Sequence, residues 1–182
     1  PRRVPAGARH VALDVANGKA LGELAKGAQA IIAAVNPAVY DAKVWARTLP
    51  PMHRGLLEGA RAADVRLVLL DGLYQYSLDQ GPLAPSTPQG PSTEKGKIRK
   101  QLADRMVAAQ ADGLRAAVLR APDFWGPNLS GALLTREVLE GLKHGKRPLL
   151  VGNPDMPHAF AHRDDVVDVV VAASGVFRRN GV

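Results

Sequence analysis

The residues of this 182-residue chain that could transfer protons are a lysine inside a long helix and a tyrosine just after an apolar strand. The lysine, Lys100, lies in residues 94–113, where apolar residues recur at helical spacing and Gly113 ends the pattern. One face of this helix carries Ile98, Leu102 and Met106. A second face carries Gly96, Lys100, Ala103 and Val107. Most lone lysines on a helix are solvated, but this placement predicts that Lys100 is more than a surface charge.

The tyrosine, Tyr74, follows an apolar strand predicted over residues 65–71. If the alternation of that strand continues, Gly72 and Tyr74 point the same way, into a cleft at the strand end. The competing interpretation is an amphipathic tyrosine that packs at the strand end with its hydroxyl bonded to backbone. We expect Tyr76, two residues further on, to be structural.

Alternating strands and helices position these residues. We expect strands at residues 9–15, 29–35, 65–71, from 114 to a Pro- and Gly-bounded loop, and at 148–152. Helices are expected at 20–27, 38–63, 94–113, 132–144 and after an extended segment near 164, the second being interrupted at Pro50 and Pro51. The strand at 29–35 is apolar on both faces. The order predicts an α/β fold with a doubly wound parallel sheet.

Ligands of such sheets bind at the carboxyl ends of the strands. The residues at those ends are Asp14, Val35–Asn36, Asp71–Tyr76 and Ala121–Pro127.

Composition narrows the function classes. The chain has no cysteine, which excludes disulfides and thiolate metal sites, and its five histidines are too scattered to favour a metal centre. The net charge of +7 raises nucleic acid as a partner, but no aromatic residues interleave with the basic cluster at 95–100. There is no apolar run of membrane-spanning length and no signal core, so we expect a soluble cytoplasmic protein.

The ordered landmarks resemble the extended short-chain dehydrogenase/reductases, in particular the NAD-dependent epimerase/dehydratase family. The segments are VALDV, IIAAVNP, VRLVLLDGLYQY, LRAAVLRAPDFWGP and HAFAHRDDVVDVVVAA. The fourth is the closest match, because the family's sixth strand commonly ends in Arg-Pro followed by Tyr-Gly-Pro. The resemblance covers nearly the whole chain and implies a single Rossmann-like NAD(P)-binding domain over residues 1–182, with residues 128–163 contributing to a small substrate-side region.

Three departures from that family bear on activity. No Gly-rich dinucleotide motif occurs, so the resemblance implies that the first βαβ unit lies before Pro1 and leaves a gap in the sheet. We therefore expect the chain to be part of a longer one, or to be completed by a partner. The family's catalytic pair is a tyrosine four residues before a lysine, and aligning Lys100 with that lysine puts Gly96 at the tyrosine position. The assisting hydroxyl falls on Gly72.

The resemblance then implies a site in which Tyr74 replaces the missing phenol as acid/base group and Lys100 binds the nicotinamide ribose. The cofactor-binding residues expected are Asp14, Ala34, Val35, Lys100, Ala121, Pro122 and Phe124. Asp14 is equally suited to capping a helix. Phe124 has packing in the loop as its alternative.

Two functions follow from these residues. The first is an NAD- or NADP-dependent epimerase, dehydratase or reductase with an altered active site, acting on a sugar-like hydroxyl or carbonyl substrate. The second is a non-catalytic nucleotide-binding or regulatory protein of the same fold, favoured by the glycines at positions 72 and 96. The expected partners are the dinucleotide and a small-molecule substrate, and a homodimer is left open. Nucleic acid and membrane are not expected as partners.

Overall fold

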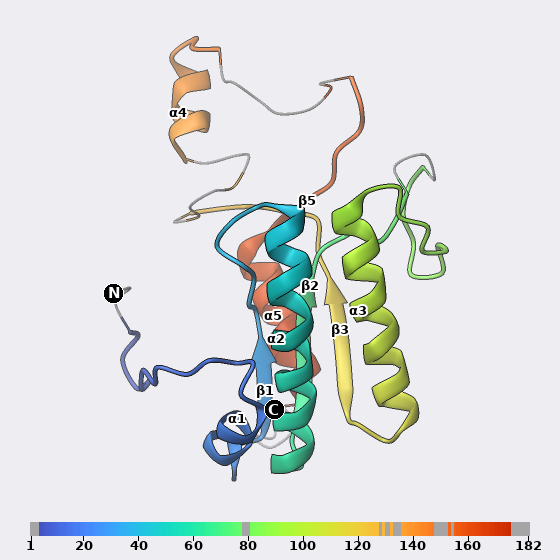
Figure 1. Cartoon of the computed structure of the whole chain (residues 1–182). Coiled ribbons are helices and arrows are strands. Elements are labelled where there is room, and N and C mark those ends of the chain that lie inside the picture. Colours follow the sequence, from blue (N-terminus) through green and yellow to red (C-terminus); the bar gives the residue numbers. More distant parts are fainter. Residues whose placement is uncertain are drawn as a thin grey trace.

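A computed structural model describes residues 4–77, 81–127, 129, 132, 136–147, 153 and 155–175. Its centre is a three-stranded parallel sheet in the order β1-β2-β3 (Figure 1). The strands are β1 (Ala30–Ala33), β2 (Arg66–Asp71) and β3 (Ala116–Arg120). In register, Ile31 pairs with Leu67, and Asp71, the last residue of β2, pairs with Arg120. All three carboxyl ends therefore meet at one edge, as predicted for a doubly wound sheet.

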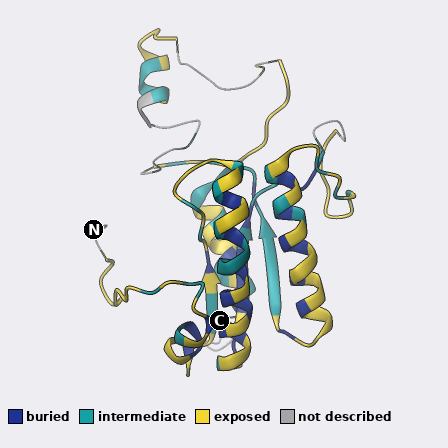
Figure 2. Ribbon diagram, viewed as in Figure 1, coloured by how far each residue is buried: buried dark blue, intermediate teal, exposed yellow. Residues whose placement is uncertain are grey.

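Helices cover both faces of this sheet. Helices α2 (Ala42–Ala63) and α3 (Glu94–Ala111) lie on one face, and α5 (Arg163–Ser174) lies against the other (Figure 1). Their inner sides are buried and their outer sides exposed (Figure 2). The central strand is the most buried, since Leu67, Val68 and Leu69 are at most 2% exposed. None of the helices in the described ranges is both long and apolar enough to span a membrane.

Helix α3 has the predicted apolar face. Thr93 caps it by accepting the Gly96 N–H at 3.0 Å, and Gly113 follows its end with φ +89°. Leu102 and Met106 are each 1% exposed, and Ile98 packs beside Leu102. The same side buries Arg99, three residues before Leu102, so a charged residue belongs to the stripe that faces the sheet.

Helix α2 corrects a prediction, because it runs unbroken through Pro50 and Pro51. Each proline removes one hydrogen-bond donor, yet the helix is held along its length by packing. Trp45, Leu49, Leu56 and Ala60 on its buried face are at most 3% exposed. Asp41 caps its start through Val44 N–H at 2.9 Å. Tertiary packing has overridden the local breaking signal.

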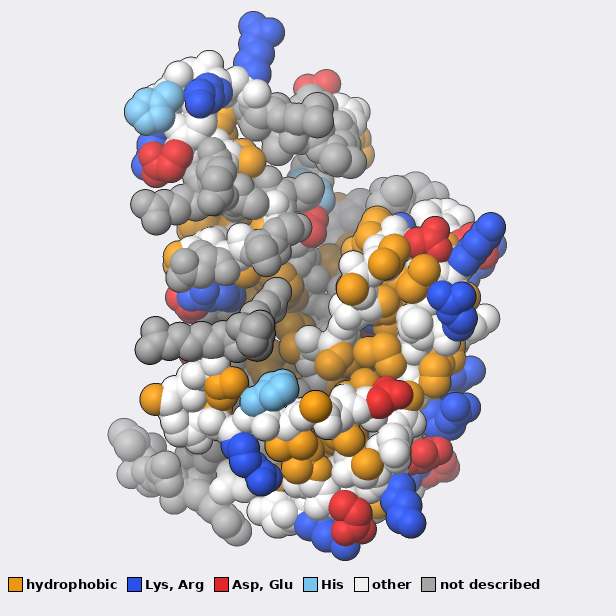
Figure 3. All heavy atoms as spheres, turned by 60° about the vertical axis from the view of Figure 1, so that its left-hand side comes forward, with side chains coloured by type: hydrophobic (Ala, Val, Ile, Leu, Met, Phe, Trp, Pro, Cys, Tyr) orange, Lys and Arg blue, Asp and Glu red, His pale blue; other side chains and the backbone are white. Residues whose placement is uncertain are grey.

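The segment at residues 9–15 corrects a second prediction, because it is not a strand. Its Leu13 packs against the core, but its backbone joins no described strand. The strand expected at 29–35 is the shorter β1, and its Ile32 is 45% exposed rather than buried. Both differences have one physical reason. Strand β1 is an edge strand, and among the described residues it pairs with β2 alone, so no strand covers its other side. Figure 3 views the molecule from this side, and hydrophobic side chains lie open between the charged ones.

Short elements complete the described chain. Helix α1 (Gly18–Ala25) starts two residues earlier than expected, and Asn17 caps its start. Strands β4 (Asp123–Trp125) and β5 (Phe160–His162) form a separate parallel pair beyond the carboxyl end of β3. Helix α4 (Arg136–Lys143) lies within the helix expected at 132–144. The strand expected at 148–152 lies outside the described residues.

Candidate functional site

A buried ion pair marks the carboxyl edge of the sheet. Arg99 Nη1 donates to Asp71 Oδ1 at 2.9 Å, and Arg99 Nη2 donates to Asn36 Oδ1 at 2.6 Å. The side chains of Arg99 and Asp71 are 6% and 3% exposed. Asp71 ends β2, Asn36 follows β1, and Arg99 is in the second turn of α3. One guanidinium therefore ties the helix to the ends of two strands.

Burial governs the titration of this cluster. It raises the pKa of the Asp71 carboxyl, and Arg99 and the Gly72 N–H only partly oppose that rise. Nearby, His53 on α2 is 3% exposed. Burial, and then the charges of Arg99 and Arg105, lower its pKa from 6.5 to about 4. The imidazole is therefore neutral at physiological pH.

Three aromatic rings lie beside the ion pair. Trp45, fully buried, packs edge-on against Tyr40 and Tyr74, with centroids 5.4 and 5.2 Å away. Lys95 Nζ is 3.3 Å from the centroid of Tyr40, and Arg99 Cζ is 4.7 Å from that of Trp45. Lys95 and Arg99, one helical turn apart, thus both face these rings. In the part of the chain that the structure describes, Lys95 has no carboxylate within ion-pair distance.

Tyr74 lies at this edge, as expected, and is 37% exposed. Its pKa is raised by burial first, and then by the hydrogen bond and charge of Tyr40; Arg99 opposes the rise only weakly. That direction is opposite to the one a phenolic base needs near neutral pH. The phenol is a proton donor and acceptor for hydrogen bonds here, not a ready phenolate.

The pair expected from sequence, Gly96 and Lys100, is not arranged as a tyrosine–lysine pair would be. A Cβ at Gly96 would collide with the backbone carbonyl of Tyr74 and lie 2.6 Å from Pro91 Cβ, so this position has no room for a tyrosine. Lys100 Nζ instead bonds both carboxylate oxygens of Asp104, at 2.8 and 2.9 Å. The cation at the strand ends is Arg99, which our sequence reasoning missed.

A signal for Arg99 was present in the sequence. Arg99, Leu102 and Met106 have the i, i+3, i+7 spacing of one helix face, so the arginine shares the buried stripe. An arginine on such a stripe needs a buried partner, and Asp71 at the end of an apolar strand was the available carboxylate.

The predicted cofactor-binding residues occupy three places. Asp14 is exposed, and its Oδ1 accepts the Ala16 N–H at 2.9 Å, a local turn rather than the helix cap, which is Asn17. Past β1, Ala34 is exposed and Val35 half-buried. Past β3, Ala121 is buried and donates its N–H to Asp71 O at 3.0 Å. Its neighbours Pro122 and Phe124 are half-buried. The last five residues flank the same edge.

Buried donors without a partner at this edge fit a ligand rich in oxygen. Gln75 is fully buried with both amide atoms unpartnered among the described residues, and Arg99 Nε is also unpartnered there. Ribose hydroxyl and carboxamide oxygens are groups that could satisfy such donors. The chain has no Gly-rich turn for a pyrophosphate. The described residues therefore fit the nicotinamide half of a dinucleotide and not its phosphates.

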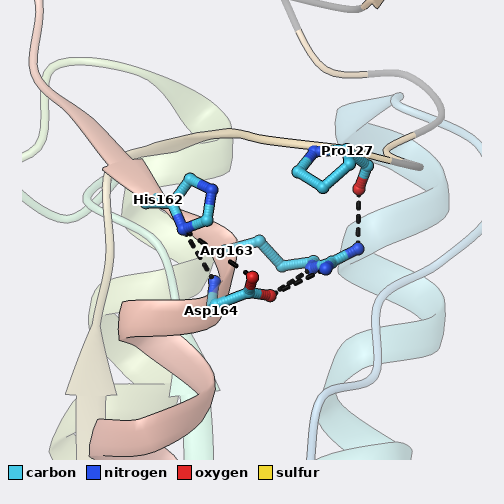
Figure 4. A network of polar contacts seen from close by, with 4 residues as sticks. All are labelled: Pro127, His162, Arg163 and Asp164. Atoms are coloured by element: carbon cyan, nitrogen blue, oxygen red, sulfur yellow. Dashed lines mark hydrogen bonds and ion pairs between the residues drawn. The ribbon is translucent and has the colours of Figure 1, made fainter.

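Strands β4 and β5 add a second polar cluster. His158 Nε2 and Asp123 Oδ2 are 2.6 Å apart, and the His158 ring packs on Phe160. At the start of α5, Arg163 binds Asp164 and donates to Pro127 O at 2.6 Å (Figure 4). These contacts fix β5 and α5 against the chain that leaves β4.

The opposite, amino-terminal edge of the sheet also has polar groups. Arg115 Nη2 lies 3.0 Å from Asp64 Oδ1, and Arg66 Nη1 donates to Ala173 O at 3.0 Å. A hollow of about 640 Å³ lies between these residues and Ser174. No site residue was predicted here, and the hollow is at the far end of the strands from Asp71.

Comparison with known proteins was made by family and by structure. Residues 2–180 match the model of the NAD dependent epimerase/dehydratase family. The curated proteins contain no match. The Rossmann-like α/β class predicted from sequence is confirmed by solved structures of similar fold.

Three of these structures illustrate the likeness. MoeE5, solved with UDP-glucose and NAD, has a TM-score of 0.76 at 21% identity, over 99% of this chain and 63% of its own. UDP-N-acetylglucosamine 4-epimerase from Bacillus cereus gives 0.75 at 15%, over 97% and 63%. DesIV, a dTDP-glucose 4,6-dehydratase from Streptomyces venezuelae solved with NAD, gives 0.70 at 23%, over 88% and 53%. The chain thus spans less than two thirds of each.

Proposed function

Because the chain belongs to the NAD-dependent epimerase/dehydratase family, we propose that the protein uses NAD or NADP to act on a hydroxyl or carbonyl carbon of a sugar-like substrate. A nicotinamide dinucleotide, when bound, supplies hydride transfer. Several proteins of similar fold are named for nucleotide sugars, which supports that substrate class.

The observation that carries the proposal is the Arg99 cluster at the carboxyl edge. Arg99 is held by Asp71 and Asn36, so α3 is fixed against the strand ends where ligands of this fold bind. That arrangement holds Lys95 one turn earlier, with its ammonium against Tyr40. Lys95 and Arg99 have the one-turn spacing of the family's catalytic pair, and both face the aromatic cluster. Lys100 instead pairs with Asp104.

These residues have separable roles in the proposed site. Arg99 positions α3, and the Lys95 ammonium donates a hydrogen bond to a ligand oxygen. Ala34, Val35, Ala121, Pro122 and Phe124 line the nicotinamide half, with Asp14 toward the adenine. Residues 128–163 contribute to a small substrate-side region. Tyr74 as acid/base group and Lys100 as ribose clamp stay predictions, and the geometry favours Lys95 and Arg99 over them.

The second candidate function is a nucleotide-binding protein without catalysis. It is favoured by one observation, the raised pKa of Tyr74, because that direction is opposite to the one a phenolic base needs near neutral pH. Both functions keep the cofactor, so they differ in turnover alone.

The experiment is a pair of measurements on the complete protein. Calorimetry with NAD⁺ and NADP⁺ tests cofactor binding. Analysis of the sugar products by NMR and mass spectrometry after incubation with UDP-glucose, dTDP-glucose and UDP-N-acetylglucosamine tests turnover, because an epimerase or dehydratase returns its dinucleotide to the oxidised form in each cycle. Binding with turnover supports the enzyme, and binding without it supports the second candidate. Absence of dinucleotide binding contradicts both. The cytoplasmic location and a homodimer stay predictions, and size-exclusion chromatography checks the second.

For the enzyme, Lys95→Met is the decisive variant. We expect a fall in kcat/KM on the order of 10²-fold, because the ammonium contacts the reacting end of the ligand. Lys97→Met is its matched control, since Lys97 is an exposed lysine of the same turn that pairs only with Glu94. Equal rates for the two variants would remove Lys95 from the site. Tyr74→Phe, measured alongside, decides the role predicted for that phenol.

A further inference from the structure

The polar cluster of β4 and β5 contains a histidine–carboxylate pair that the family's tyrosine–lysine chemistry does not use. His158 Nε2 lies 2.6 Å from Asp123 Oδ2, and the two side chains are 50% and 49% exposed. The bond is short and joins a ring nitrogen to an ionisable oxygen, which is the geometry of a strong, charge-assisted hydrogen bond. Half-exposure leaves the pair open to a ligand.

We propose that His158 is the proton-transfer residue of this protein, with Asp123 as the residue that positions its ring. The inference deepens the proposed function and rests on it. It assigns the acid/base role that the alignment of Gly96 with a tyrosine had left empty.

The pair lies at the edge where the other site residues gather. Asp123 is three residues beyond the last residue of β3, and Arg120 at that end pairs with Asp71 in register. Phe160, which stacks on His158, pairs with Asp123 in the β4–β5 ladder. The charge of Asp123 is also one of the influences that raise the pKa of Tyr74, so the carboxylate lies near the aromatic cluster.

The hydrogen bond determines which ring nitrogen can react. A carboxylate only accepts, so the proton of the neutral ring is on Nε2 and is donated to Asp123. Nδ1 then carries a lone pair, and no hydrogen bond of Nδ1 is made within the described residues. The chemistry matches that of a base whose orientation is fixed by a neighbouring acid.

The proposed step moves one proton and one hydride from the substrate. The substrate O–H bond breaks and an Nδ1–H bond forms, giving an imidazolium whose charge Asp123 compensates. The electron pair left on oxygen forms the carbonyl as the adjacent C–H bond gives its hydride to the oxidised nicotinamide dinucleotide. In the reverse direction His158 returns the proton from Nδ1 to the carbonyl oxygen.

The other histidines of this region are already engaged or closed off. His162 packs on Trp125 with centroids 4.8 Å apart, and its Nδ1 accepts the Asp164 N–H at 3.4 Å as the cap of α5 (Figure 4). A Cβ at Gly126 would lie only 3.1 Å from the His162 ring, and the His162 side chain is 27% exposed against 50% for His158. His53 is buried. His158 is the half-exposed histidine with a carboxylate behind it.

The test uses His158→Gln in the complete protein, with His10→Gln as the matched control in the exposed amino-terminal segment. We expect His158→Gln to lower kcat with a nucleotide sugar by about 10²-fold or more, at little change in KM and in NAD⁺ affinity by calorimetry. His158→Ala should regain rate with added imidazole, whereas a residue needed only for packing would not be rescued. Asp123→Asn should lower kcat by less.

A second readout does not require turnover. Long-range ¹⁵N NMR of the histidine rings should show His158 protonated at Nε2 in the wild type and a mixture of tautomers in Asp123→Asn. A protein that binds NAD⁺ and turns over a nucleotide sugar, yet keeps its kcat in His158→Gln, overturns the inference alone. So does a wild-type ring protonated at Nδ1. A protein that binds no dinucleotide overturns the proposed function and this inference together.

Discussion

The two ends of strand β2 carry arginine–aspartate pairs of nearly equal length in opposite surroundings. At the carboxyl end, Arg99 and Asp71 are 2.9 Å apart and 6% and 3% exposed. At the amino end, Arg115 and Asp64 are 3.0 Å apart and 58% and 96% exposed. The contact distance is the same, so what distinguishes the ends is burial. The buried pair ties helix α3 to the ends of β1 and β2, and that end carries the residues of the proposed ligand site.

The energetic reason is the asymmetry of desolvation. Breaking a buried pair leaves a charge without water or partner, whereas breaking an exposed pair returns both groups to solvent. Substitutions at one end at a time test this difference.

The largest effect is expected for Arg99→Met, which leaves the Asp71 carboxyl buried and uncompensated. We expect the free energy of unfolding to fall by about 3–5 kcal/mol. Urea denaturation followed by circular dichroism measures it. A loss below about 1 kcal/mol would show that Arg99 is not buried as described.

Acid should weaken the carboxyl end next. Folding lowers the pKa of His53 from 6.5 to about 4, so its stabilising contribution is complete above pH 6.5 and is lost as the pH falls toward 4. The loss is roughly 3 kcal/mol at 1.36 kcal/mol per pKa unit. Asp71, with its raised pKa, acts in the opposite direction, losing its contribution as the pH rises. Unfolding measured from pH 7 to 4 should show this slope in the wild type and in the exposed His144→Gln control, and not in His53→Gln.

A smaller effect is expected where α3 meets the loop after β2. Gly96→Ala places a methyl group against the Tyr74 carbonyl, so we expect a destabilisation of about 1–3 kcal/mol despite alanine's helix propensity. Gly141→Ala in α4 is the matched control, because its Cβ would be 3.7 Å from Lys146 Cβ, an ordinary contact. Thermal melts of both variants compare them. A stabilised Gly96→Ala would mean that the position tolerates a side chain.

The smallest effect belongs to the amino end. Arg115→Met should change the free energy of unfolding by at most about 1 kcal/mol, since both partners are exposed. A loss matching that of Arg99→Met would erase the difference between the two ends.

The parts of the fold that periodicity determines were predictable from the sequence. The parallel strands β1, β2 and β3, helix α3 with its Leu102–Met106 face, and the acidic start of α5 follow from local pattern. The unbroken helix α2 was not predictable from local pattern, because the packing of Trp45 and Leu56 outweighs the effect of its two prolines. The strand expected at 9–15 failed because a strand needs a partner, which no local pattern supplies.

The site was harder to predict for a geometric reason. One residue of register on a helix turns a side chain by about 100°, so aligning Lys100 instead of Arg99 moved the reasoning to a neighbouring face. Composition does not distinguish the two faces, but the space around each residue does. Gly96 has no space for a side chain, whereas the Lys95 ammonium lies over the ring of Tyr40. The His158–Asp123 pair joins residues 35 positions apart, which only the fold brings together.

The most direct test of the account asks which end of the sheet binds the cofactor. Titrating the complete ¹⁵N-labelled protein with NAD⁺ and following the backbone amides by NMR should give the largest shifts at residues 34–36, 72–76, 95–99 and 121–124. Residues around Arg66, Arg115 and the amino-end hollow should shift little. Shifts concentrated at the amino end, with residues 95–99 unchanged, would contradict the account.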